Sequence, residues 1–520
     1  MELTETSRVS TRIQFSERTL SLVALGALML LGLALRLYNL SPVAWVPDHY
    51  ERLIEVRAML EGELPSSAIY TPGFSLVLLV PSAVFGVSVS TMQLVTIVFG
   101  LSLIPMVYLL VVQVTQDRFA AFIASGLCAT SPFLLHTNRF AFVDSVATTL
   151  AIVALYAVPR LKSQSLLHGA AFGICLGLLF LLRQSNAVLI LPLVLYWMLI
   201  NKASLRPTAW LSLFATPLWI ASASVFLTIS LIATIPSNWF GSNTGEFAAL
   251  DNVPANLGAY LLQLTGLFAT PLLAPLAFGG IRALREQNAN FLVAAIGSII
   301  ALVTVCSPLA FANSRYIDIG LVMSYAFVGV GLSALLRSNP RDGQSRPMRL
   351  IRAWGIVSAP LLFLAFLVQS GSFVEKWHSE AARTDYGLAK EISPIIDALP
   401  GNSLLVASTG RAMVDSTRRD IELLDLLDLS LRKPDRERGS EELLRAISLV
   451  AEAERPVFYL YTHLEADPEN AGGAFGGHDH DIYLDFLINR YLIREIWRSE
   501  GKHSGKYPWI LYEVSSRDQR

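Results

Sequence analysis

The chain has 520 residues, of which 53% are hydrophobic and only 16% are charged, and its mean hydropathy is +0.50. Soluble domains contain about 25% charged residues, so this composition excludes an ordinary soluble protein and predicts a polytopic α-helical membrane protein. The net charge of −1 gives no reason to expect a nucleic acid as partner.

Eleven apolar runs come close to the roughly 20 residues that a helix needs to cross a membrane. We expect these spans near residues 20–40, 91–113, 118–136, 144–160, 168–182, 184–200, 208–234, 257–280, 291–310, 316–336 and 350–370. The first run is too long for a cleaved signal peptide, so it is predicted to remain as a span.

Arginine and lysine indicate which loops face the cytoplasm. Most bases of the membrane part lie before the first span and in every second short loop, and the positive-inside rule places these segments inside. Residues 1–19 are therefore expected in the cytoplasm and the C-terminal part outside. The only Asn-x-Ser/Thr site, Asn39-Leu40-Ser41, is followed by Pro42, which favours a bacterial inner (plasma) membrane over the endoplasmic reticulum.

One apolar segment, Gly73 to Val89, does not fit this alternation of loops. If it crossed the membrane, all later basic loops would face outward. The segment is short and contains Pro81, so we predict a re-entrant or interfacial helix inside a first external loop over residues 41–90.

The tail of the chain differs from the membrane domain, which we expect over residues 20–372. Residues 375–520 hold 26 acids and 19 bases, whereas residues 1–374 hold 15 acids and 21 bases. We predict an extracytoplasmic α/β domain over residues 373–520, which is long enough for a core of its own.

Short apolar runs predict the strands of this tail domain. They are residues 403–408 and 457–461, with another strand and turn within 420–431. His478-Asp479-His480-Asp481 follows a glycine-rich run, so it is more typical of a flexible loop than of a metal site.

Unusual polar and aromatic residues gather in the expected outer loops. Among them are Asp48, His49, Glu51, Arg139, Asp144, Arg183, Trp239, Arg315 and Tyr316. The cytoplasmic loops are short and merely basic. We therefore expect chemistry on the outer face, where no nucleotide pool exists and a donor has to arrive in the membrane.

Several motifs stand in an order that resembles a known family. They are Arg36-Leu37-Tyr38, Asp48, Gly62, Tyr70-Thr71-Pro72-Gly73, Ser131-Pro132, the segment from Arg139 to Asp144, and Arg315-Tyr316. Over roughly residues 20–340 this order resembles the GT-C glycosyltransferases of the dolichyl-phosphate-mannose protein mannosyltransferase type, including the bacterial aminoarabinose transferase. Two departures are visible: the family's Asp-Glu pair is Asp48-His49 here, and its Pro-Pro is Pro72-Gly73.

The resemblance implies inverting transfer of a hexosyl or pentosyl group from a polyprenyl-phosphate donor to a glycan, lipid or protein acceptor. Asp48 is then the expected general base. Asp144 is a second catalytic candidate that orients the acceptor, holds Arg139 or helps to bind a cation. No metal is predicted to be required, although Mg²⁺ or Mn²⁺ held by these two acids stays open. We expect a monomer.

The resemblance also assigns binding roles. Arg315, Arg183 and Arg139 are expected to bind the donor phosphate, because guanidinium groups neutralise a leaving phosphate well. The residues expected to contact substrate are His49, Glu51, Tyr316 and Trp239.

Each assignment has a plainer alternative. Asp48 and Glu51 have the spacing of a capping box for a helix that ends before Gly62, and Asp144 is placed to cap the next span. The arginines are also suited to reach lipid headgroups, and the aromatic residues suit an interfacial belt.

Two other functions stay open for the whole protein. A lipid flippase or transporter explains the helices equally well, but it explains neither the polar outer face nor the tail domain. A surface-polysaccharide polymerase or ligase shares the donor class and differs in the acceptor.

Overall fold

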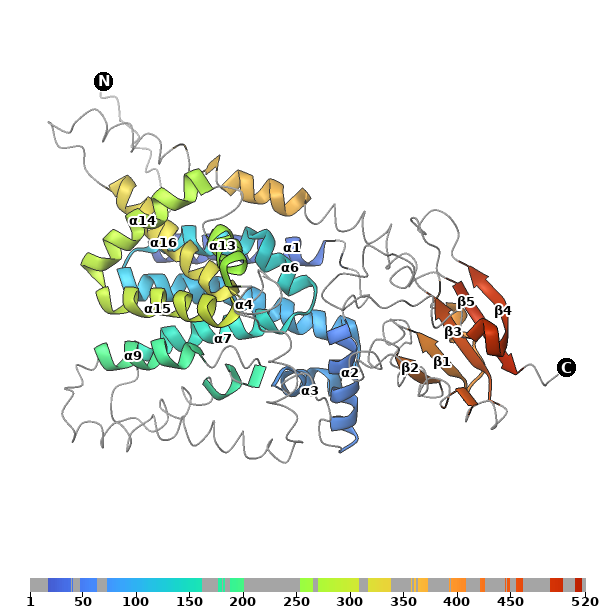
Figure 1. Ribbon diagram of the computed structural model, residues 1–520. Helices are drawn as coiled ribbons and strands as arrows, with labels where there is room; N and C mark the ends of the chain where they lie inside the picture. The colour runs from blue at the N-terminus through green and yellow to red at the C-terminus, as the bar shows by residue number, and fades with distance from the viewer. Residues whose placement is uncertain are drawn as a thin grey trace, which may run out of the picture.

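The computed structural model describes residues 17–38, 40, 47–62, 73–160, 176–179, 181–182, 188–200, 253–264, 270–307, 317–337, 357, 360–361, 363–372, 392, 394–407, 421–425, 445, 447–448, 455–461, 487–498 and 510–516. Within these residues the chain forms a bundle of helices and one five-stranded sheet (Figure 1). The predicted span 208–234 lies outside the described residues.

The helices follow the apolar runs of the sequence, and polar side chains cap several of them. Their bounds are α1 (Glu17–Leu37), α2 (Pro47–Leu60), α3 (Gly73–Phe85), α4 (Val89–Thr115), α5 (Arg118–Thr130), α6 (Pro132–Arg139), α7 (Val143–Ala157), η1 (Val158–Arg160), α9 (Ile190–Ile200), α13 (Val253–Leu264), α14 (Thr270–Gln287), α15 (Ala289–Cys306) and α16 (Asp318–Arg337). The caps Ser88, Asp117, Ser131 and Asn288 each accept a hydrogen bond from a backbone N–H in the first turn of the following helix.

Four helices of the described part are long and apolar enough to cross a membrane. They are α4, α15, α16 and the continuous helix Val143–Arg160, which consists of α7 and η1. The pair α5 and α6 forms a fifth candidate that is bent by 53°. The helical bundle of a membrane protein is thus present, while the total of eleven spans stays a prediction.

Two predicted spans have a different form in the structure. The span 118–136 is broken at Ser131, whose backbone is extended, and Pro132 begins α6. The span 257–280 overlaps α13 and α14, and α14 continues to Gln287, beyond the predicted end. Hydropathy reports which residues are apolar, but it does not report where the backbone bends or where a helix ends, so it did not predict the break at Ser131.

Small residues allow α14 and α16 to pack closely. A Cβ added to Gly280 would lie 1.8 Å from the carbonyl oxygen of Phe327, and one added to Gly331 would lie 1.9 Å from that of Leu276. Glycine is therefore required at both positions, as is common where membrane helices meet. This contact makes α16 a central helix of the bundle, with most of its side chains buried.

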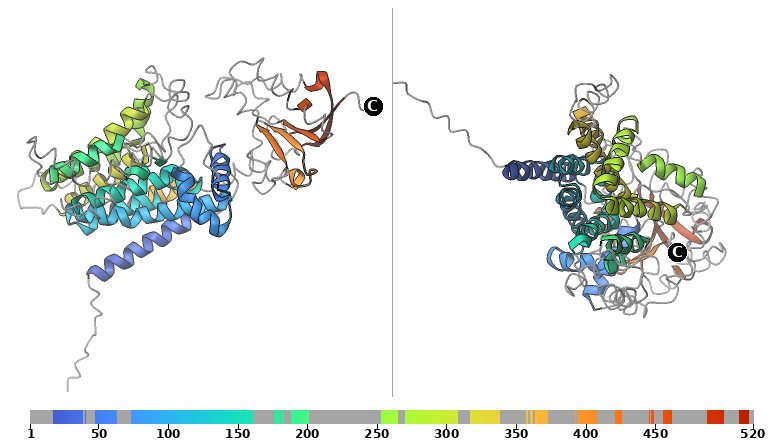
Figure 2. Two further views of the ribbon diagram at one scale, coloured as in Figure 1. Left: turned by 90° about the horizontal axis from the view of Figure 1, so that it is seen from below. Right: turned by 90° about the vertical axis from the view of Figure 1, so that its left-hand side faces the viewer.

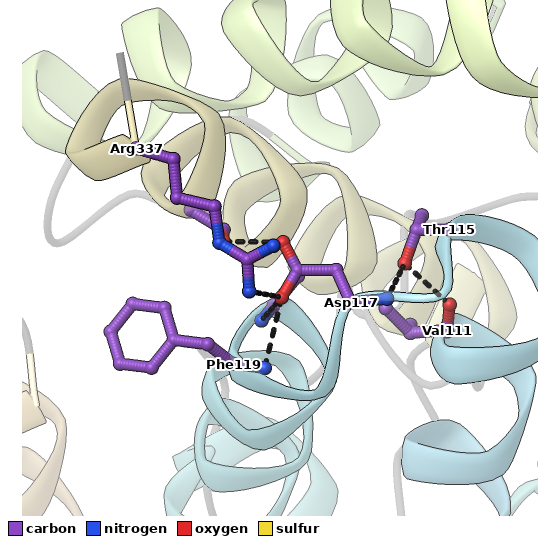
Figure 3. A network of polar contacts seen from close by, with 7 residues as sticks. Val111, Thr115, Asp117, Phe119 and Arg337 are labelled. Atoms are coloured by element: carbon purple, nitrogen blue, oxygen red, sulfur yellow. Dashed lines mark hydrogen bonds and ion pairs between the residues drawn. The ribbon is translucent and has the colours of Figure 1, made fainter. Parts of the chain in front are cut away.

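The turn between α4 and α5 is joined to the end of α16 (Figure 3). Asp117 caps α5 by accepting hydrogen bonds from the N–H groups of Phe119 and Ala120, over 2.9 and 3.0 Å. The same carboxylate accepts from the hydroxyl of Ser333 over 2.5 Å and from Nη2 of Arg337 over 2.7 Å. One acid thus ties together a helix start and the last turn of a distant helix.

The sheet consists of strands from the C-terminal quarter of the chain. They are β1 (Leu404–Ala407), β2 (Glu422–Asp425), β3 (Val457–Tyr461), β4 (Tyr491–Arg498) and β5 (Ile510–Ser516), in the order β2-β1-β3-β5-β4. Strand β1 pairs in parallel with β2 and β3, and β5 pairs antiparallel with β3 and β4. The strands predicted at 403–408, 457–461 and within 420–431 are confirmed as β1, β3 and β2.

Figures 1 and 2 show the sheet beyond the end of the bundle at which α2 and α3 lie. The sheet and the first predicted external loop are thus at the same end of the molecule. That residues 373–520 form a separate domain outside the membrane stays a prediction.

Candidate functional site

Helix α2 contains three of the predicted site residues. Asp48, His49 and Glu51 lie near its start, and their side chains fall outside the described part of the structure. The predicted N-cap at Asp48 is wrong, because Pro47 is already helical and Asp48 is the second residue of the helix. Proline suits the first position, since the N–H that it lacks would have no helical partner there. The predicted end is confirmed: the helix stops just before Gly62, which has a φ of +88°.

The buried side of α2 holds a charge pair. Arg52 and Glu55 are only 5% and 3% exposed, and Arg52 Nη1 donates a hydrogen bond to Glu55 Oε2 over 3.0 Å. The hydroxyl of Ser75, on α3, donates to the same carboxylate oxygen. Leu53 and Val56 are buried beside the pair. Helix α2 is therefore attached to α3 by hydrogen bonds as well as by apolar contact.

The start of α3 contacts the segment that precedes Arg183. A Cβ added to Gly73 would lie 2.4 Å from the carbonyl carbon of Leu181 and 2.6 Å from the backbone nitrogen of Leu182. Only glycine permits this approach, which gives a physical reason for glycine in the Pro72-Gly73 motif. Arg183 itself lies outside the described residues, but its predecessor in the chain lies against α3.

Arg139 contacts the C-terminal end of α1. Its Nη1 donates hydrogen bonds to the carbonyl oxygens of Leu35, Arg36 and Tyr38, over 2.9, 3.4 and 2.6 Å. The last carbonyls of a helix lack intrahelical partners and carry partial negative charge, so a guanidinium group stabilises them. At least this nitrogen of Arg139 serves the fold, and the predicted contact with a donor phosphate stays a prediction.

Asn138, in α6, forms hydrogen bonds with residues of α1, α4 and α7. Its Oδ1 accepts a hydrogen bond from Arg36 Nε over 2.6 Å, and its Nδ2 donates to the hydroxyl of Ser145 over 2.7 Å. The Thr96 hydroxyl donates to the Asn138 carbonyl oxygen, and a Cβ added to Gly100 would lie 1.9 Å from Oδ1. The ends of α1 and α6 and the start of α7 are thus held on the face of α4.

Asp144 lies in the first turn of α7 and is 5% exposed. The alternative that it caps this helix is wrong, because Phe142 occupies the N-cap position and makes no side-chain cap bond. The turn before it contains Ala141 at a φ of +53°, a conformation that is uncommon for a residue other than glycine. Asp144 is therefore a buried acid at the start of a helix that follows a tightly bent turn, and its catalytic role stays a prediction.

The remaining predicted site residues lie outside the described residues. They are Arg183, Trp239, Arg315 and Tyr316. Among the side chains that the structure describes, no group of three or more His, Cys, Asp or Glu is placed to hold a metal ion.

A cavity with both polar and apolar lining lies at the opposite end of the bundle. It has a volume of about 540 Å³, and Gln113, Tyr196 and Asn288 are among the residues that line it. Gln113 follows Gln93 by twenty residues on α4, or about 30 Å at the rise of an α-helix. Because Gln93 donates to the carbonyl oxygen of Arg139, this cavity is well separated from the candidate site.

Sequence reasoning missed the residues that hold the site together. Glu55, Ser75 and Asn138 were not among the predicted site residues, although Arg52 and Glu55 have the i, i+3 spacing of a helical ion pair. Ser75 and Asn138 give no comparable signal, because their partners lie 20 and 102 residues away.

The helical bundle, with α2 and α3 at one end and a sheet beyond them, has counterparts among solved structures. The fold is similar to that of ArnT from Cupriavidus metallidurans bound to undecaprenyl phosphate, with 13% identity, a TM-score of 0.65, and coverage of 96% of this chain and 98% of that one. It is also similar to the oligosaccharyltransferase AglB from Archaeoglobus fulgidus, at 14% identity and a TM-score of 0.54, over 97% of this chain and 75% of that one. A third similar structure is the arabinofuranosyltransferase AftD from Mycobacteria, with 13% identity and a TM-score of 0.53, over 97% of this chain and 40% of that one. At such identities the likeness establishes a shared fold alone.

The sequence matches a family model over part of its length. Residues 70–231 match the model of the dolichyl-phosphate-mannose-protein mannosyltransferase family. No curated protein matches the chain. The family model covers less than half of the chain, and its match agrees with the resemblance seen in the motifs.

Proposed function

We propose that the protein is an inverting glycosyltransferase that moves a sugar from a polyprenyl-phosphate donor to an acceptor on the extracytoplasmic face. The observation that best supports this is the packing of α2 on α3 and of α3 on Leu181, because it brings the helix with Asp48 close to the residues before Arg183. The donor class is supported by the family match and by the undecaprenyl phosphate and dolichol phosphate bound to ArnT and AglB.

In the proposed reaction a hydroxyl oxygen of the acceptor attacks the anomeric carbon from the side opposite the phosphate. The bond between this carbon and the phosphate oxygen breaks as the new glycosidic bond forms, so the configuration inverts. Asp48 takes the proton of the hydroxyl, and the polyprenyl phosphate leaves with the bonding electron pair. The acceptor is a lipid, a glycan or a protein, and an assay with each class distinguishes them.

The leaving phosphate gains negative charge, which Arg315 and Arg183 neutralise in this proposal. Arg139 contributes to the same field while holding the end of α1. Asp144 orients the acceptor. His49, Glu51, Tyr316 and Trp239 contact the sugar or the acceptor, and aromatic rings suit the apolar face of a sugar.

The test is transfer of labelled sugar by the purified full-length protein in lipid nanodiscs, across a panel of polyprenyl-phosphate sugars. A general base contributes about 100- to 10,000-fold in rate, so Asp48→Asn is expected to lower kcat at least about 100-fold. Glu61→Gln removes an exposed acid just after the C-terminal end of α2 and is expected to leave kcat unchanged.

Two results would contradict the proposal. One is full activity of Asp48→Asn. The other is a wild type that transfers nothing from any donor but moves lipid between leaflets, which would identify a transporter. We expect transfer to persist with a chelator present; a loss that Mn²⁺ restores would instead indicate a required cation.

A further inference from the structure

The charge pair of Arg52 and Glu55 on α2 is unusual because both side chains are buried, although α2 is a short helix within the predicted first external loop. The side chains of Arg52 and Glu55 are 6% and 3% exposed, next to Leu53 and Val56. Removing two charges from water costs several kcal/mol per ion, and the attraction between them often does no more than offset that cost. Apolar residues of similar size would hold α2 on the bundle at least as well, so stability alone does not explain the pair.

The pair is part of a connection between two helices. Glu55 Oε2 accepts hydrogen bonds from both Arg52 Nη1 and the Ser75 hydroxyl of α3. Its other oxygen, Oε1, is buried and makes no hydrogen bond with any described residue. One carboxylate oxygen thus fixes both the rotation of α2 and its position along α3.

The rotation of α2 determines where the proposed base lies. Asp48 precedes Arg52 by four residues and Glu55 by seven, and residues with this spacing share one face of an α-helix. A helix of 14 residues is only marginally stable by itself in water, so its orientation depends on contacts with its neighbours.

We propose that Arg52, Glu55 and Ser75 are positioning residues that orient Asp48 towards the acceptor hydroxyl by locking α2 on α3. This inference rests on the proposed function. The three residues do not contact substrate. They act on the rate by keeping the base within hydrogen-bond reach of the proton that it takes, and a displacement of about 1 Å is enough to lower a rate about 100-fold.

The test compares two serines of α3. Ser75→Ala removes the hydrogen bond to Glu55, whereas Ser82→Ala removes an equally buried hydroxyl that makes no hydrogen bond with any described residue. Ser75→Ala is expected to lower kcat about 10-fold with KM for donor and acceptor unchanged, and Ser82→Ala to match the wild type. Glu55→Gln is expected to lower kcat further, since Arg52 then loses its carboxylate.

A double-variant measurement separates positioning from a general loss of structure. If Ser75 acts only through Asp48, Ser75→Ala causes no further fall in the residual rate of Asp48→Asn, so the two effects are not additive. A raised KM with unchanged kcat, an equal fall in the Asp48→Asn background, or equal activity of Ser75→Ala and wild type would overturn the inference.

Failure of the proposed function has a different signature. In that case the wild type is inactive, or Asp48→Asn is as active as the wild type, and there is no base for these residues to position. An active wild type that depends on Asp48 but not on Ser75 refutes the positioning role alone.

Discussion

At the scale of single residues, two buried arginines, Arg36 and Arg139, serve the fold. Arg36 is fully buried and donates to the carbonyl oxygens of Gly32 and Ala129 as well as to Asn138. Arg139 binds the carbonyls at the end of α1. Helix ends present partly negative carbonyls, so they attract the same cations that a phosphate attracts. Residue type alone does not distinguish the two partners.

Gly73 gives a prediction at this scale. Gly73→Ala places a methyl group against the backbone of Leu181 and Leu182, which cannot yield as a flexible side chain would. We expect the variant to shift this segment and the adjoining Arg183, and so to raise KM for the donor and lower kcat/KM about 10-fold or more. Steady-state kinetics over a series of donor concentrations measures this effect.

The control for this substitution is Gly26→Ala. Gly26 lies in α1, and nothing comes within 4 Å of an added Cβ. It is expected to leave the kinetics unchanged and to stabilise the helix by up to about 1 kcal/mol. Equal kinetics for Gly73→Ala and the wild type would show that the contact with Leu181 has no role in activity.

At the scale of elements, the polar connections between helices lie near their ends. Asn138 joins the ends of α1 and α6 to the start of α7, and Asp117 joins α5 to α16 (Figure 3). Apolar packing allows helices to slide or rotate, whereas a hydrogen bond with fixed geometry specifies one register. These few hydrogen bonds therefore fix the positions of the helix ends relative to one another.

Asp117 is expected to contribute more to stability than the arginine that it binds. Asp117→Ala removes a helix cap and the acceptor of the Ser333 hydroxyl, which together are worth about 2 kcal/mol. Arg337→Ala is expected to cost less than about 1 kcal/mol, because the Arg337 side chain is 62% exposed. Thermal unfolding in detergent compares the two variants, and a larger loss for Arg337→Ala would contradict the capping role.

At the scale of the whole molecule, the sheet and α2 lie at one end of the bundle, while α14 ends at the other end with Gln287, which lines the cavity there. In the predicted orientation the first end is extracytoplasmic, and the sheet stands on the same side of the membrane as α2.

Cysteine labelling tests this orientation. Glu61, Glu495 and Glu286 are exposed, and the native Cys128 and Cys306 are buried. In a background with Cys175→Ser, a membrane-impermeant maleimide added to intact inner-membrane spheroplasts is expected to label Glu61→Cys and Glu495→Cys. Glu286→Cys is expected to react only after permeabilisation. Labelling of Glu61→Cys and Glu495→Cys from opposite sides would contradict the arrangement in Figure 1.

The sequence by itself determined the features that depend on local composition. Hydropathy established the membrane class, apolar runs located β1 and β3, and Gly62 marked the end of α2 because a left-handed conformation favours glycine. Strands β4 and β5 were not predicted, since charged residues such as Arg494 and Glu513 interrupt their apolar pattern.

Only the tertiary structure decided which residues meet. Gly73 lies against Leu181, Ser75 binds Glu55, and Arg139 binds the end of α1 across about a hundred residues of sequence. No local sequence pattern predicts these partners, because long-range contacts form only when helices pack against each other. Asp48 was therefore visible in the sequence as an acid after the first span, whereas the residues that orient its helix became visible only in the fold.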